Sequence, residues 1–340
     1  MDEEVGVIDG GWSSETIRLA VWLSGQVSFE QATQILNQVG RISISASSIW
    51  RRTKKWGNAL LAQEARERAI ANAMPSREQP QSGECKHNKP MGFSLDGWMV
   101  HIRGDGWKEV KSATIFEVKQ REIRDRKTGE TVERATATAS SYIAHLGGPE
   151  LFGEKLWAEG QRRQLHTAYE KVCVSDAAHW IWGLCEDYFP EAEQIVDWYH
   201  VLQHLHAAAA ALCGEATDKA RQWVDAHKTT LFQGHAARIA HLLETLASQH
   251  SSEVARKLLE EAGFFRNNQR RMRYLEYREQ GWPIGSGTIE SACKQFQSRM
   301  TGPGMRWSRP GAERMLALRA IILSARFHDC WRALQNSPAF

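Results

Sequence analysis

Three acidic residues occupy positions from which their carboxylates could act on one substrate. Asp96 lies in the apolar segment FSLDGW, where an unpaired charge is costly to bury, so we expect it to be solvated, paired or metal-bound. Asp176 follows the apolar strand-like segment 172–175, and side chains at the carboxyl ends of strands in open α/β sheets face the ligand crevice. Glu290 falls in the first turn of an expected helix, whose positive end favours the ionised carboxylate.

Carboxylates that converge raise one another's pKa values unless a counter-charge is present. Magnesium or manganese supplies that charge and prefers oxygen ligands. Two such ions about 4 Å apart can hold both oxygens of an in-line phosphoryl displacement. Taken singly, each acid is better explained as a helix cap, a turn residue or a surface charge. The hypothesis of a two-ion site therefore depends on the three acids meeting.

Basic residues are concentrated in the last quarter of the chain. The whole chain has a net charge of +3, but the segment 266–326 holds twelve Arg or Lys and four Glu, a net +8 over 61 residues. Such an excess is typical of polyanion binding, although a solvated helical face is the alternative. Arginine binds phosphate with two hydrogen bonds. We expect phosphate contacts on both sides of the active site, on one continuous surface with the acids, from Arg270, Arg271, Arg273, Lys294, Arg299 and Arg306.

The segment 13–57 predicts three short helices. Ser28 and Gln31 form a capping-box pattern at the second helix, and Gly40 ends it. In the third helix Ile49, Thr53 and Trp56 share one face, while the basic residues project elsewhere. A Gly-containing turn followed by a basic helix predicts a helix-turn-helix, although a plain packing module is the alternative. The expected DNA-binding residues are Arg51, Arg52, Lys54 and Lys55.

The remaining pattern divides the chain into further regions. After the helix-turn-helix region at 1–74, the polar segment 75–90 contains three of the nine prolines and predicts a linker. From 91 to 198, three extended segments precede alternating helices and strands, which predicts an α/β fold with a mixed sheet. The segment 199–280 is expected to be helical throughout, and 281–340 a closing helical part that carries Glu290.

Four strings in the sequence resemble the conserved blocks of bacterial insertion-sequence transposases of the ISKra type, relatives of the Mutator-like group. They are SLDGWMVHIRGDGWKEV, VCVSDAAHWIW, IVDWYHVLQHLH and PIGSGTIESACKQFQSRMTGPGMRW, and the resemblance runs from about Gly25 to Arg319. It implies an RNase H-like core with a five-stranded mixed sheet and an all-helical insertion. It also implies a DDE triad in which Asp96 is the first acid, Asp176 the second and Glu290 the last.

The resemblance extends to activity and partners. It implies cleavage of phosphodiester bonds at transposon ends and transfer of the 3′-hydroxyl to target DNA, with Mg²⁺ or Mn²⁺, as two ions. The partner is double-stranded DNA, bound by a homodimer or a higher assembly. Asp197-x-x-His200 resembles a signature of the wider group, which we interpret as support of the site rather than as zinc ligation with His204. An RNase H-like nuclease without strand transfer and a catalytically idle DNA-binding regulator are the alternatives.

Bulk composition excludes other classes. No window is apolar enough to cross a bilayer, and the acidic first residues lack the apolar region of an export signal. The six cysteines form no C-x-x-C pair, which favours a reducing compartment. We therefore expect a cytoplasmic protein that is nucleoid-associated when bound. Many relatives of the resembled family carry paired cysteines before this region, so the sequence is interpreted as a short subtype or a truncated copy.

Overall fold

The computed structural model describes residues 7–8, 12–73, 89–124 and 129–335. Of the predicted linker at 75–90, only residues 89 and 90 are among them. Within the described part of the chain, no helix is both long and apolar enough to span a membrane.

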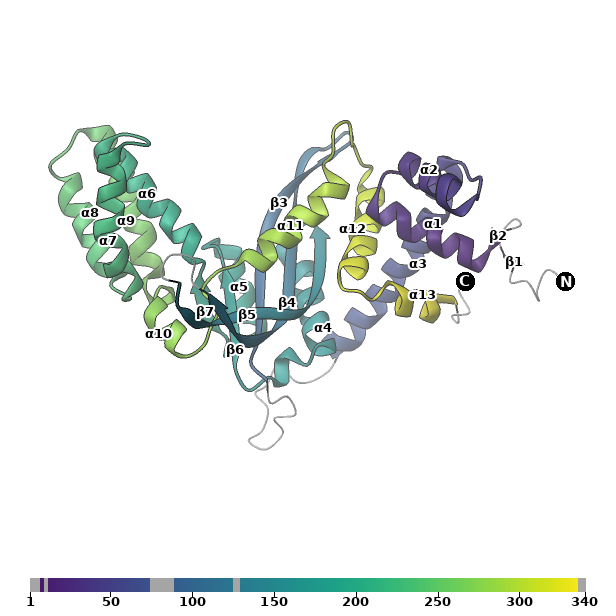
Figure 1. The fold of residues 1–340 in the computed structure, drawn as a ribbon, viewed down its shortest axis with the longest axis horizontal. Coiled ribbons are helices and arrows are strands. Elements are labelled where there is room, and N and C mark those ends of the chain that lie inside the picture. The colour runs from purple at the N-terminus through teal and green to yellow at the C-terminus, as the bar shows by residue number, and fades with distance from the viewer. Residues whose placement is uncertain (1–6, 9–11, 74–88, 125–128, 336–340) are drawn as a thin grey trace.

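A five-stranded mixed sheet forms the centre of the molecule (Figure 1). Its order is β5-β4-β3-β6-β7, with β3 (Met91–Ile102), β4 (Gly106–Arg124), β5 (Thr131–Leu146), β6 (Lys171–Ser175) and β7 (Glu193–Val196). The first three strands form an antiparallel meander, and β6 and β7 run parallel to β3. The predicted α/β fold with a mixed sheet is confirmed, and the arrangement is compatible with an RNase H-like one.

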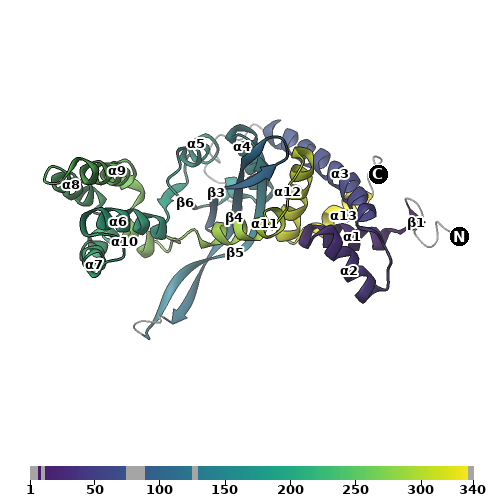
Figure 2. The same cartoon turned by 90° about the horizontal axis from the view of Figure 1, so that it is seen from above.

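Helices cover both faces of the sheet because side chains alternate along β3. Phe93 and Leu95 pack in one buried cluster with α4 (Pro149–Arg162) and α5 (His179–Tyr188). Trp98 and Val100 pack in a second with α11 (Gly287–Met300), α12 (Arg309–Leu323) and α13 (Phe327–Gln335). Figure 2 shows α4 and α5 on the opposite side of the strands from α11. The alternation places Asp96 on the face that α11 covers.

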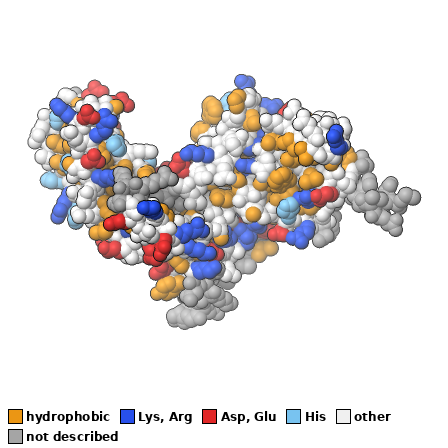
Figure 3. Space-filling model, in the orientation of Figure 1, with side chains coloured by type: hydrophobic (Ala, Val, Ile, Leu, Met, Phe, Trp, Pro, Cys, Tyr) orange, Lys and Arg blue, Asp and Glu red, His pale blue; other side chains and the backbone are white. Residues whose placement is uncertain are grey.

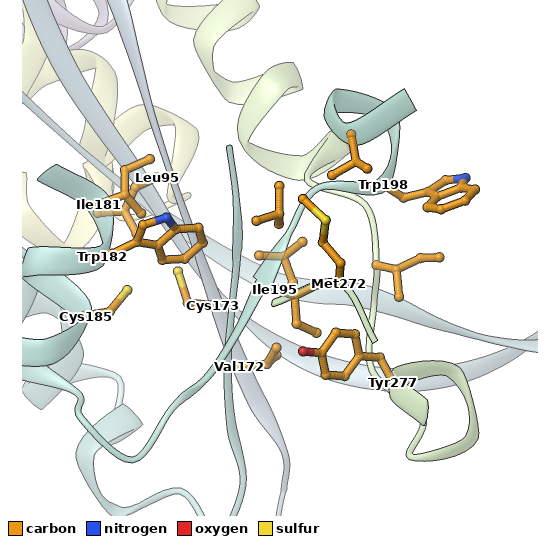
Figure 4. Packing of buried hydrophobic residues seen from close by; sticks show 14 of the residues in the cluster. Leu95, Val172, Cys173, Ile181, Trp182, Cys185, Ile195, Trp198, Met272 and Tyr277 are labelled. Carbon is orange, nitrogen blue, oxygen red and sulfur yellow. The ribbon is translucent and has the colours of Figure 1, made fainter. Parts of the chain in front are cut away.

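A helical lobe follows β7 and lies at one end of the molecule (Figures 1 and 2). It consists of α6 (Trp198–Cys213), α7 (Asp218–Phe232), α8 (Ala236–Ala247) and α9 (Ser252–Asn268), and the chain returns through α10 (Tyr274–Glu279). As expected, the segment 199–280 is formed mainly by these helices. Figure 4 shows Met272 and Tyr277 beside Ile195, whereas Trp182 and Cys185 lie with Leu95 and Cys173. The short strands β6 and β7 are thus held by apolar contacts from both sides.

Three helices precede the sheet: α1 (Ser14–Gln26), α2 (Phe29–Gly40) and α3 (Ala46–Ala73). The capping box at Ser28 is present, and Ile49, Thr53 and Trp56 are buried as predicted. The third helix runs unbroken to Ala73 instead of ending near residue 57. Its Trp56 ring lies 5.3 Å from Phe327 and 5.7 Å from Trp331, between ring centroids. The amino-terminal helices therefore share a core with the carboxyl-terminal ones.

Candidate active site

The strand register brings Asp96 and Asp176 together. Phe93 pairs with Cys173 in the parallel ladder between β3 and β6. Two residues further on, the Leu95 N–H donates a hydrogen bond of 2.8 Å to the Ser175 hydroxyl. Asp96 and Asp176 are the next residues of the two segments, so they lie side by side at the level where β6 ends and β3 continues.

Backbone groups orient both aspartates. Asp96 accepts a hydrogen bond of 2.7 Å from the Gly97 N–H, and Asp176 accepts one of 3.1 Å from the Ala178 N–H. The Asp176 bond closes the turn between β6 and α5. Asp96 is therefore fixed within a regular strand and Asp176 by the short turn after β6, rather than by long loops.

The third acid comes from α11, which packs across β3. Ile289, Ala292, Cys293 and Phe296 form its buried stripe. Glu290 lies beside that stripe with 64% of its side chain exposed, and it pairs with Lys294 at 2.5 Å. The Cys293 thiol, one turn after Glu290, lies near enough to Asp96 to affect the pKa of that carboxylate. The helix thus faces the aspartates through Cys293, with Glu290 at the edge.

The charges of the three acids interact. Burial raises the pKa of Asp96 above its usual value, and the nearby carboxylates of Asp176 and, more weakly, Glu290 raise it further. The Gly97 N–H, which donates a hydrogen bond to the carboxylate, and the nearby Cys293 thiol oppose the shift. Burial and the Asp96 charge in turn raise the pKa of the Cys293 thiol, which stays protonated at neutral pH. This crowding of negative charge is the electrostatic condition expected at a cation site.

The donor set fits magnesium or manganese by its chemistry, because all three side chains offer carboxylate oxygens. The side chains are not yet gathered as ligands. Across the described residues, no three His, Cys, Asp or Glu side chains are close enough together to hold a metal ion. Glu290 is the outlying acid, because its carboxylate is directed to Lys294. A shared ion therefore requires the Glu290 side chain to leave Lys294 and turn toward Asp96.

Asp197 connects the end of β7 to the start of α11. Its side chain is only 5% exposed. One carboxylate oxygen accepts a hydrogen bond of 2.7 Å from the His200 N–H and so caps α6, and the other accepts one of 2.6 Å from the Ser286 N–H. The Trp198 N–H also donates to the Ile284 carbonyl at 2.9 Å. Asp197 thereby fixes the turn from which the helix of Glu290 begins.

The His200 side chain does not take part in that link. Its ring lies 4.9 Å from the His204 ring and 5.9 Å from Phe264, between centroids. The His204 Nδ1 is paired with Glu261 at 2.7 Å. The imidazole of His200 therefore packs between α6 and α9, and only its backbone N–H contributes to the Asp197 cap.

The arginines before α11 contradict the expected continuous surface. Arg273 is paired with Glu193 at 2.9 Å, and Arg271 donates a hydrogen bond of 2.7 Å to Gln194. Glu193 and Gln194 begin β7, whereas Asp176 and Asp197 follow the carboxyl ends of their strands. With about 3.3 Å of rise per residue, the two ends of β7 are roughly 10 Å apart. The prediction that Arg271 and Arg273 lie at the mouth of the site is wrong, because strand direction separates them from the acids.

Arg270 belongs to the same end of the sheet. It is exposed and lines a hollow with Glu193 and Lys171. Figure 3 shows the face of Figure 1 hollowed between the helical lobe and the sheet, with basic side chains dispersed among acidic and uncharged ones. This face does not form the single basic surface that the sequence suggested.

The position of Arg299 also differs from the expectation. It was expected to contact phosphate, but it is only 2% exposed and donates a hydrogen bond of 2.8 Å to the Ser24 carbonyl at the end of α1. Burial, together with the neighbouring Arg319, lowers its pKa to about 10. The reason is that the end of α1, which packs on α12, lies within reach of Arg299, so the guanidinium meets a helix-end carbonyl instead of solvent. Lys294 and Arg306 remain exposed, Arg306 beside the turn between β3 and β4.

The basic set on α3 divides by burial. Arg51, Lys54 and Lys55 are exposed. The Arg52 guanidinium instead lies 3.6 Å from the centroid of the Trp12 ring and is half-buried. The first three are therefore available to solvent, whereas Arg52 stabilises the contact between α3 and the segment before α1.

Sequence reasoning missed the contacts that position the acids. Ser175, Ser286 and Cys293 were not singled out as parts of the site. The spacing of Cys293, three residues after Glu290, could have identified it as a neighbour on the helix. Nothing in the sequence marked the bond from the Leu95 N–H to Ser175, because it joins residues 80 positions apart.

Comparison with protein-family models gives no match to this chain, and comparison with curated proteins gives no significant match either. The fold and the site define an α/β protein with three neighbouring acids: one within the central strand β3, one after the carboxyl end of β6 and one on the covering helix.

Proposed function

We propose that the chain is a DNA transposase of the acidic-triad kind, resembling the ISKra type, with Asp96, Asp176 and Glu290 as its catalytic carboxylates. One observation carries the proposal: three acids from two strands and a helix lie near enough that Asp176 and Glu290 raise the pKa of Asp96. The mixed sheet, compatible with an RNase H-like order, supports it. Because a fold by itself does not assign an activity, the proposal depends on the three acids.

Each residue has a defined task in the proposed reaction. Asp96, within β3, and Asp176, directly after β6, are at the same level of neighbouring strands and form the rigid half of the site. Glu290 forms the adjustable half, because its exposed side chain is held only by its ion pair with Lys294 and would exchange that partner for a cation. Asp197 positions the start of α11, and the Cys293 thiol favours the ionised form of Asp96. Mg²⁺ or Mn²⁺ held there supplies Lewis-acid stabilisation of charge developing on a phosphoryl group.

DNA recognition is assigned to the amino-terminal helices, interpreted as a helix-turn-helix. The exposed Arg51, Lys54 and Lys55 lie along the first half of α3, as expected for a helix that approaches a major groove. The exposed Trp50 ring, with the Lys54 ammonium 5.6 Å from its centroid, lies in the same stretch. Two copies of the chain on paired transposon ends would complete the assembly.

The test begins with the DNA that flanks the gene. Short inverted repeats there would supply the end substrate, and cleavage in magnesium would be measured for Asp96→Asn, Asp176→Asn and Glu290→Gln. Each is expected to lose more than about a hundredfold in rate, since even partners behind metal ligands contribute 10- to 100-fold. Glu260→Gln is the matched control, because Glu260 forms a similar exposed helical ion pair, with Arg256 at 2.6 Å.

The products distinguish the alternatives. Cleavage followed by joining of the 3′-hydroxyl to a second DNA supports a transposase. Cleavage without joining indicates a nuclease, and DNA binding without cleavage indicates an idle regulator. Rates near that of Glu260→Gln for any one triad variant would remove that residue from the site.

A further inference from the structure

A pocket on the outer side of the sheet joins the helical lobe to the strand β5. It has a volume of about 500 Å³. Four elements and the segment before α11 contribute to it, so it is built by tertiary packing rather than by one loop. Its lining residues include Arg134 of β5, Tyr199 of α6, Lys228 and Phe232 of α7, and Arg278 of α10.

The pocket gathers positive charge. Arg134, Lys228 and Arg278 are all half-buried, and among the described lining residues Glu133 is the one acid. Burial lowers the pKa of Arg278, and the neighbouring Arg134 lowers it further. Neither Arg278 nor Lys228 forms a hydrogen bond or ion pair within the described residues. Two cations without a partner among the described residues, Lys228 and Arg278, favour the binding of an anion here.

An exposed aromatic ring stands at the pocket. The Tyr199 side chain is 68% exposed, although it follows the buried Asp197 and Trp198 directly. Trp198 packs edge-on to Phe232, with 5.4 Å between ring centroids, and forms an apolar wall behind it. A free aromatic face beside cations is the combination that binds an unpaired base and its phosphate.

The pocket adjoins the proposed active site. A Cβ atom on Gly285 would lie 3.5 Å from the Tyr199 ring and 3.8 Å from the Asp197 carboxylate. Gly285 and Ser286 belong to the turn that leads into α11 and Glu290. A strand that passes the acids can therefore reach Tyr199 across this turn.

We propose that this pocket binds one phosphate of a single DNA strand next to the scissile bond, with the adjoining base stacked on Tyr199. A single strand is favoured because a pocket of about 500 Å³ admits a nucleotide but not a duplex. The assignment rests on the proposed function for the identity of the strand. It predicts that the pocket selects unpaired over paired DNA, whereas α3 contacts the duplex.

The test measures binding of a fluorescein-labelled oligothymidine of about ten nucleotides to the full chain by fluorescence anisotropy. Arg278→Gln is expected to weaken binding about tenfold and to reduce the salt slope by about 0.7, the value for one lost contact to a single strand. Tyr199→Ala is expected to weaken it at least about fivefold, and Tyr199→Phe to retain it, because stacking needs only the ring. Arg238→Gln is the matched control, since Arg238 is an exposed arginine of α8 in the same lobe.

Circular dichroism of each variant verifies that the fold is retained, and a blunt duplex serves as the second probe. Equal oligothymidine binding by Arg278→Gln and Arg238→Gln would overturn the pocket, as would equal losses for Tyr199→Ala and Tyr199→Phe. The two proposals fail separately. If Arg278→Gln selectively loses oligothymidine binding but the wild type shows no metal-dependent cleavage, the pocket is supported and the transposase proposal is contradicted. Cleavage by the wild type with unaffected binding in Arg278→Gln removes only the pocket.

Discussion

Individual charged residues in this protein are governed by where packing places them. Asp96 is largely enclosed between β3 and α11, beside two other carboxylates, so its charge is disfavoured in the folded state. Arg299 is enclosed as well, but its guanidinium finds the Ser24 carbonyl. The Asp96 charge therefore destabilises the fold in a way that a bound cation can relieve, whereas Arg299 stabilises the packing of the helices.

Removing the Asp96 charge is expected to stabilise the metal-free protein. The pKa of Asp96 is raised in the fold, so its charge costs stability at neutral pH. That cost disappears as the pH falls through the raised pKa toward the ordinary value of the unfolded chain. Asp96→Asn should therefore raise the melting temperature at pH 7 in EDTA and reduce the difference between pH 7 and mildly acidic pH. A lower melting temperature than the wild type under those conditions would contradict the charge crowding.

Arg299→Ala is expected to lower the free energy of unfolding by about 1–3 kcal/mol, because the Ser24 carbonyl loses its buried donor. Chemical denaturation measures this loss. The comparison is Arg306→Ala, an exposed arginine, which should leave the unfolding free energy within about 0.5 kcal/mol of the wild type. If Arg299→Ala changed the salt dependence of DNA binding and left stability untouched, the structural role would be incorrect.

At the scale of elements, the site depends on how α11 is anchored. The helix packs on β3 through its apolar stripe, and its first turn is tied to β7 by Asp197. The carboxylate of Asp197 satisfies one backbone N–H in each of two segments that would otherwise lack a buried acceptor. The distance of Glu290 from the aspartates therefore depends on a residue that does not itself need to touch the substrate.

Asp197→Ala is expected to destabilise the protein by about 2–4 kcal/mol, since it removes a helix cap and a second charged hydrogen bond. Asp197→Asn keeps one acceptor oxygen and should recover part of that loss. Hydrogen exchange of the Ser286 and His200 amides reports on the two bonds directly. Unchanged protection of the Ser286 amide in Asp197→Ala would show that the turn is held by other contacts.

The basic stretch of α3 gives a prediction for the helix as an element. Replacing Arg51, Lys54 and Lys55 with alanine should flatten the dependence of duplex binding on salt by about 0.9 for each lost phosphate contact. The melting temperature should hardly change, because all three side chains are exposed. Arg52→Ala is the contrasting variant, since it loses the contact with Trp12 and should affect stability more than binding.

At the scale of the whole molecule, the two ends of the chain fold on each other. Ile17, Trp56 and Leu60 from the first helices are buried with Leu316, Phe327 and Trp331 from the last ones. Arg319 reinforces this contact, donating to the Gly25 carbonyl at 3.1 Å and to the Gln295 carbonyl at 2.7 Å. The amino-terminal region is thus joined to the sheet through α12 rather than attached by a linker alone.

Deleting residues 1–73 is therefore expected to cost far more than a peripheral domain would. Each fully buried apolar side chain contributes about 1.5–3 kcal/mol, and a native protein is stable by only about 5–15 kcal/mol. The truncated chain should unfold at a much lower temperature and bind a hydrophobic dye through the exposed faces of α12 and α13. An unchanged melting temperature would instead establish the amino-terminal helices as an independent domain.

Much of the local structure follows from short-range patterns in the sequence. The strands around Leu95 and Val174, the capping box at Ser28 and the buried stripe of α11 all follow from alternation, helical periodicity and cap chemistry. The mixed character of the sheet follows from three consecutive extended segments before the alternating ones. These features depend on neighbours within a few residues, which a sequence displays directly.

Only the tertiary structure decided which charged residues meet. Arg273 and Glu290 are close in sequence, but the first is paired with Glu193 at the amino end of β7 and the second lies with Asp96. Arg299 is a charged residue, but it is buried and donates a hydrogen bond to a carbonyl at a helix end. Strand direction and helix docking act between residues 80 to 275 positions apart, and no periodicity carries that information. The sequence determined the elements and the acids, while packing determined their distances and sorted scaffold arginines from solvent-exposed ones.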